Sequence, residues 1–123
     1  MSEFVEVKTA ELVGPALDWA VAQTEGVAYN AKYLVQTKCN MAGHIQSVKY
    51  TANYLPSTDW AQGGPLLDKY CSALNKSDTG WWAHAGDRLG EGGTALVTLC
   101  RAIVAAKLGG VVQVPAELVG VGA

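Results

Sequence analysis

The segment from residue 56 to residue 65 concentrates the side chains of this chain that are best suited to binding. It places an acid beside a tryptophan and follows them with a glutamine, two glycines and a proline. Glycines allow a ligand to approach the backbone, an indole can stack on a planar ring, and the amides at a helix start favour an anion. The candidate binding residues of this segment are Ser57, Thr58, Asp59, Trp60, Gln62, Gly63 and Gly64.

The same segment also has a purely structural interpretation. Ser57 and Asp59 are side chains that cap helix amides, so Ser57 is better explained as a cap than as a nucleophile. Trp60 would then fill the core, and the two glycines would make a bend before Pro65. The residue types alone leave both interpretations open.

Two further places carry side chains that could bind a ligand or a partner. Asp18 and Trp19 lie at the flank of a predicted helix, as an exposed binding pair or as a packed indole beside a solvated acid. Arg101 is the lone charge within an apolar run, and a buried arginine needs a partner. We expect Arg101 to meet a ligand's carboxylate or phosphate, or to pair internally with Asp18 or Asp59.

Evidence for catalysis or metal binding is thin. His44 and His84 have no neighbouring nucleophile or acid, and no known catalytic motif occurs, so assignment as an enzyme is uncertain and leans against one. Cys39 and His44 come closest to a zinc-ligand spacing, but two ligands do not make a site. The sequence predicts no metal, no cofactor and three reduced cysteines, with Cys71 and Cys100 on apolar helix faces.

The pattern of expected helices and strands, which must position these side chains, predicts a single α+β domain over residues 1–123. Three helices are expected near residues 15–24, 65–75 and 94–108, with Thr94 capping the last, and they pack on a small, mainly antiparallel sheet. The third helix is apolar nearly all round, which predicts that it is enclosed by other elements or a second subunit. The strands at 4–8 and 111–115 should be neighbours, because similar Ala-Glu-Leu turns follow both.

The remaining segments are assigned from weaker patterns. Residues 32–37 and 45–50 could form a hairpin that turns through residues 40–43, and residues 81–84 read as a short strand. A short helical turn should end at Gly63-Gly64, and a new helix should open at Pro65. Residues 87–93 contain three glycines and are expected to form a flexible loop.

Composition limits the classes of partner. Half of the residues are hydrophobic and 16% are charged, with a formal net charge of −2 and no basic stripe, which disfavours nucleic-acid binding. The longest apolar stretch, residues 95–108, is too short to span a bilayer, and no signal peptide is recognisable near Met1. These features predict a cytoplasmic protein. The aromatic content and the apolar third helix favour a homo-oligomer, most simply a dimer.

Three blocks of the sequence together resemble the NinX-like family of small bacteriophage and prophage proteins, a family of unknown function. The blocks cover residues 9–22, 56–65 and 94–118, and the second is the most specific. The sequence departs from the family pattern at residues 27–53 and at the Gly92-Gly93 entry to the last block. The resemblance implies a phage accessory protein and supplies no catalytic residues.

The leading functional hypothesis is therefore a non-catalytic phage accessory protein that binds a host or phage factor. The alternative is a protein that binds or sequesters a small anionic metabolite or nucleotide near the segment from Ser57 to Pro65, and an enzyme comes third. A pocket walled by Trp60, Gly63 and an unpaired Arg101 would favour the small ligand. A flat apolar patch would favour a protein partner.

Overall fold

The computed structural model describes residues 3–40 and 43–119, and within the long hairpin it describes residues 31–40 and 43–51 by their backbone alone. The described chain is an α+β fold, as predicted. Its elements, in chain order, are β1 (Phe4–Lys8), η1 (Thr9–Glu11), α1 (Gly14–Glu25), β2 (Ala31–Asn40), β3 (Gly43–Ala52), α2 (Trp60–Tyr70), β4 (Cys71–Ser77), β5 (Gly80–Ala85), β6 (Arg88–Gly92), α3 (Ala95–Leu108), β7 (Val111–Pro115) and η2 (Ala116–Leu118).

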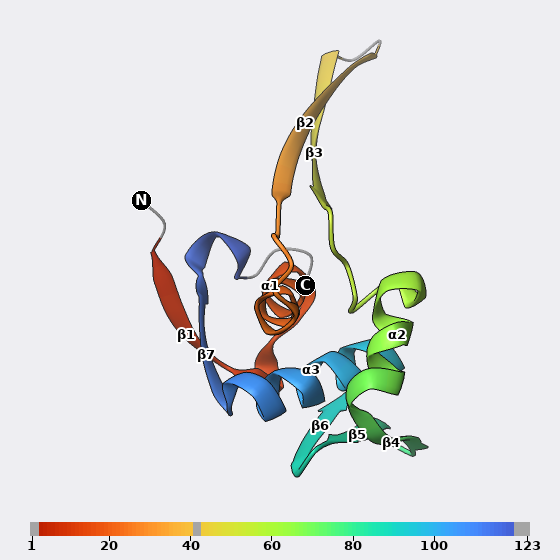
Figure 1. The fold of residues 1–123 in the computed structure, drawn as a ribbon. Coiled ribbons are helices and arrows are strands. Elements are labelled where there is room, and N and C mark those ends of the chain that lie inside the picture. Colours follow the sequence, from red (N-terminus) through yellow and green to blue (C-terminus); the bar gives the residue numbers. More distant parts are fainter. Residues whose placement is uncertain (1–2, 41–42, 120–123) are drawn as a thin grey trace.

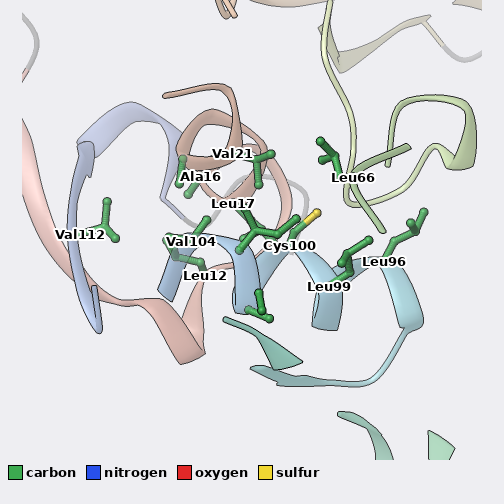
Figure 2. Packing of buried hydrophobic residues seen from close by; sticks show 14 of the residues in the cluster. Leu12, Ala16, Leu17, Val21, Leu66, Leu96, Leu99, Cys100, Val104 and Val112 are labelled. Atoms are coloured by element: carbon green, nitrogen blue, oxygen red, sulfur yellow. The ribbon is translucent and has the colours of Figure 1, made fainter. Parts of the chain in front are cut away.

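The last helix, α3, is the centre of the fold. It contacts α1, α2 and the sheet of β4, β5 and β6, so it is surrounded on several sides (Figure 1). Leu99, Ile103 and Val104 are fully buried, and Leu17 of α1 packs into the same cluster (Figure 2). The Thr94 side chain accepts the Val97 N–H and caps the helix. The expectation of an enclosed, apolar third helix is confirmed.

The terminal strands β1 and β7 are antiparallel neighbours, as the sequence predicted. Val5 lies opposite Val114, and Val7 lies opposite Val112. Val112 and Val114 of β7 are buried and belong to the hydrophobic core. A 3-10 turn follows each strand, as the similar Ala-Glu-Leu sequences predicted. The seven strands of the described residues form three separate antiparallel sheets, β1–β7, β2–β3 and β4–β5–β6, where one sheet had been expected.

The segment with the weakest sequence pattern forms the most prominent feature of the ribbon. Strands β2 and β3 pair along ten positions as one antiparallel hairpin that projects from the rest of the chain (Figure 1). The predicted hairpin is correct, and its strands are longer than expected. Met41 and Ala42, within the predicted turn, lie outside the described residues.

The predicted break at Gly63-Gly64 is wrong. Helix α2 runs without interruption from Trp60 to Tyr70, with both glycines and Pro65 inside it. The predicted helix over residues 65–75 is wrong beyond Tyr70, because strand β4 begins at Cys71. Leu74 packs against the core from a strand, so its apolar spacing fitted a helix by coincidence.

The predicted flexible loop over residues 87–93 is also wrong, because residues 88–92 form strand β6. Gly90 and Gly92 lie on the side of β6 that faces α3. A Cβ atom on Gly90 would come within 2.5 Å of the Ala102 backbone nitrogen. These glycines therefore permit the close approach of a helix to a strand, and flexibility is not their role. The neighbouring strand β5 contains the predicted strand at residues 81–84.

Candidate functional site

The segment singled out from sequence begins helix α2 and fixes its start through side-chain hydrogen bonds. The Asp59 carboxylate accepts the Ala61 N–H at 2.9 Å, as a helix cap does. The Gln62 amide accepts the Leu55 N–H at 2.6 Å and donates to the Asn53 carbonyl at 3.1 Å. Asp59 and Gln62 therefore hold the chain that leads into α2, which supports the structural interpretation for these two residues.

Trp60, between these two residues, does not fill the core. Its side chain is 55% exposed although it occupies the first turn of α2. A cavity of about 330 Å³ lies beside it and is lined by Ser57, Thr58, Trp60, Thr94, Ala95, Leu96 and Val97. The segment thus presents an indole next to the start of α3. We call this surface the Trp60 surface.

The two glycines of the motif differ in their surroundings. A Cβ atom on Gly63 would lie 2.3 Å from the Pro56 carbonyl oxygen and 2.8 Å from Leu96 Cδ2. Gly63 is buried, so α2 packs directly on these two neighbours and leaves no room for a ligand there. Gly64 has more space, since the nearest neighbour of a Cβ atom added there would be the Trp60 ring, at 3.8 Å.

Asp18 is a buried acid that bonds the backbone of the Trp60 surface at Ser57. This residue is 1% exposed, and its carboxylate accepts the Ser57 N–H at 2.9 Å. Burial raises the pKa of the Asp18 carboxyl, while the Ser57 hydroxyl and N–H partly oppose that rise. The hydroxyl lies near the carboxylate but has no partner of full hydrogen-bond geometry among the described residues. Asp18 is therefore not the solvated acid that one sequence interpretation placed beside Trp19.

Trp19 lies apart from the Trp60 surface. Its ring packs on Phe4 with ring centres 6.0 Å apart, and it is half-buried. It borders a separate cavity of about 270 Å³ next to β7. The sequence pair Asp18-Trp19 therefore contributes to two different regions of the molecule.

Arg101 does not pair with either predicted partner. Its Nε donates to the Leu12 carbonyl at 2.9 Å, and its Nη1 donates to the Glu91 carbonyl at 2.8 Å. The prediction of an ion pair with Asp18 or Asp59 is wrong, because both acids bond backbone amides near α2 instead. Arg101 ties Leu12, the residue after η1, to β6 and lies in a different region from Trp60.

Sequence reasoning missed a second group of side chains that the fold brings to Arg101. Trp81, Trp82 and His84 of β5 line one cavity of about 630 Å³ together with Arg101. The alternation of Trp82 and His84 along a strand was the available signal, but their neighbour β6 had been taken for a loop. We call this cavity the β6 groove.

The cysteine and histidine side chains that the structure describes are those of Cys71, Cys100 and His84. Cys71 is half-buried and Cys100 is buried, and both are free thiols. No group of three potential metal ligands occurs among the described residues. The side chains of Cys39 and His44, the weak zinc spacing, lie outside the described residues.

Comparison with known proteins identifies the family. The sequence model described as Bacteriophage P22, NinX matches residues 8–107, which is most of the chain and includes α1, the Trp60 surface and nearly all of α3. No curated protein matches the chain. Within the part of the chain that the structure describes, no helix is long and apolar enough to cross a membrane. The chain belongs to the NinX family of bacteriophage proteins.

Proposed function

We propose that this phage accessory protein is non-catalytic and binds a protein of the host or of the phage through the Trp60 surface. One observation carries the proposal, which is the 55% exposure of the Trp60 side chain at the start of a helix. Exposed tryptophan commonly dominates the binding energy of protein interfaces, where it fills a pocket on the partner. The adjoining cavity would accept an apolar side chain from that partner.

The surroundings of Trp60 favour a protein over a small anionic metabolite at this surface. Gly63 is closed off by Pro56, and Arg101 lies elsewhere, so the pocket that would have indicated a small ligand is not formed. The Thr94 hydroxyl is already occupied by the Val97 N–H at 3.2 Å. Ala95, Leu96 and Val97 supply an apolar wall instead.

Two variants with matched exposure test the proposal. Trp60→Ala should lose the partner in native mass spectrometry of the protein purified from phage-infected cells. Phe4→Ala should retain it, because Phe4 is 54% exposed on the distant strand β1. Both variants should melt close to the wild-type temperature, so that loss of binding is not loss of folding. A partner that remains bound to Trp60→Ala would refute the proposal.

We also propose a homodimer. An isolated two-stranded hairpin is marginally stable in water, and β2 and β3 make no more than marginal contact with any other described helix or strand. A second copy that packs against this hairpin would supply the missing support. Light scattering that shows a monomer at high concentration would contradict this.

A further inference from the structure

The β6 groove combines a half-buried cation with an aromatic wall, at a distance from the Trp60 surface. Strand β6 is an edge strand of its sheet, and the groove lies beside it. A second cavity of about 340 Å³ adjoins the first, and both are bordered by Leu89, Glu91 and Arg101. The first cavity alone has a volume typical of small-molecule sites, about 300–1,000 Å³.

The guanidinium of Arg101 is only partly satisfied by the protein. It uses two of its N–H groups on the neutral carbonyls of Leu12 and Glu91. A guanidinium carries about five such donors, so the others remain without an acceptor among the described residues. No carboxylate of the described chain forms an ion pair with it.

Arg101 is half-buried, and its unpaired N–H groups are open to solvent. Desolvation lowers the pKa of Arg101, which shows that the surroundings disfavour its charged form. Arginine nevertheless stays protonated in proteins, so the charge remains without a counter-charge. A bound anion would supply both the counter-charge and the missing acceptors, and arginine is well suited to grip a carboxylate or phosphate with two N–H groups.

The aromatic wall beside Arg101 comes from the face of β5 that is turned toward α3. Ala83 and Ala85 are buried on this face, so Trp81 lies on it as well, and Trp82 and His84 lie on the opposite face. Trp81 pairs with Gly92 of β6, where an added Cβ would lie 3.2 Å from Arg101 Nη1. The half-buried indole of Trp81 is therefore a platform next to Arg101 on which a planar group can stack.

We propose that the β6 groove binds a small organic anion, with its carboxylate or phosphate on Arg101 and its planar ring against Trp81. This site is independent of the Trp60 surface and of any protein partner there. Glu91 also borders the groove, and its carboxylate opposes an anion. Its removal should therefore strengthen binding.

Four probes separate the charge from the ring, each titrated into the full-length protein. Benzoate and phenyl phosphate carry both features, benzamide lacks the charge, and inorganic phosphate lacks the ring. We expect benzoate or phenyl phosphate to shift the indole N–H signals of Trp81 and Trp82 in nitrogen-15 spectra and to leave that of Trp60 unchanged. Benzamide and inorganic phosphate should bind at least about ten-fold more weakly.

The variant test uses the acid of the groove, because Arg101→Gln would also remove the bonds to Leu12 and to β6. Glu91→Gln should raise the affinity for benzoate or phenyl phosphate by about two- to five-fold. Glu6→Gln makes the same chemical change on β1, outside the groove, and should leave the affinity unchanged. Trp81→Ala should lower it.

Three outcomes would overturn the proposal. The first is that none of the four probes shifts the Trp81 and Trp82 signals. The second is that benzamide binds as well as benzoate, which would mean that Arg101 is not the anchor. The third is that Glu91→Gln behaves like Glu6→Gln, since the charge of the groove would then not affect binding.

Discussion

Replacing each of the adjacent glycines of α2 by alanine should change stability in opposite directions. Gly63 lies against the Pro56 carbonyl, and an added Cβ would fall 2.3 Å from that oxygen, more than 1 Å inside the 3.4 Å at which ordinary contact begins. The Cβ of an alanine at position 64 would meet only the exposed Trp60 ring, at 3.8 Å. Neither glycine has a positive φ, so alanine is compatible with the backbone at both positions.

The magnitudes follow from two terms. Alanine gains about 1 kcal/mol over glycine inside a helix, and this gain applies equally to both substitutions. Overpacking a close contact costs about 1–3 kcal/mol, and a clash with backbone should reach the upper end because no rotamer relieves it. Gly64→Ala should therefore be about 1 kcal/mol more stable than wild type, and Gly63→Ala about 2 kcal/mol less stable.

Urea unfolding followed by circular dichroism measures both changes, and thermal melts check them. The two variants should differ by about 3 kcal/mol, which corresponds to roughly 10 °C in melting temperature for a chain of this size. Equal stability of the two variants would refute the close packing of α2 on Pro56. Destabilisation by both would instead support a helix break at the glycine pair, as the sequence had suggested.

Three further predictions concern buried groups. Burial raises the pKa of Asp18 above 3.8, so wild type should gain stability relative to Asp18→Asn as the pH falls from 7 through the raised pKa, and lose it as the pH rises. A difference in unfolding free energy between the two proteins that stays constant over this pH range, measured by urea unfolding, would contradict this. Burial also raises the pKa of the Cys100 thiol, so in a variant with serine at the other cysteines it should react with iodoacetamide at pH 8 only after unfolding; rapid labelling of the native state would contradict its enclosure. Gly90→Ala should lower the melting temperature through its clash with the Ala102 backbone, whereas Gly93→Ala, with no neighbour within 4 Å, should not; equal melting temperatures would show that β6 does not lie close against α3.

Local patterns were sufficient where the signal needed no knowledge of neighbours. Thr94 identified the start of α3, and the unbroken apolar run that follows it predicted an enclosed helix, because such a surface is stable only out of water. Alternation predicted β1, and the similar turns that follow β1 and β7 predicted that these two strands pair. Asp59 is a helix cap by residue type, and it acts as one.

The tertiary structure decided what the glycines and the charges do. Gly63 and Gly90 read as a break and a loop, but both are sites where a helix touches backbone, and only the packed neighbours distinguish the two uses. Trp60 is exposed and Asp18 is buried, opposite to the simplest expectation for each residue type. Arg101 bonds the carbonyl of Leu12, 89 residues away in the sequence, and that of Glu91 on the neighbouring strand β6, so its partners depend on how the chain folds and not on its local sequence.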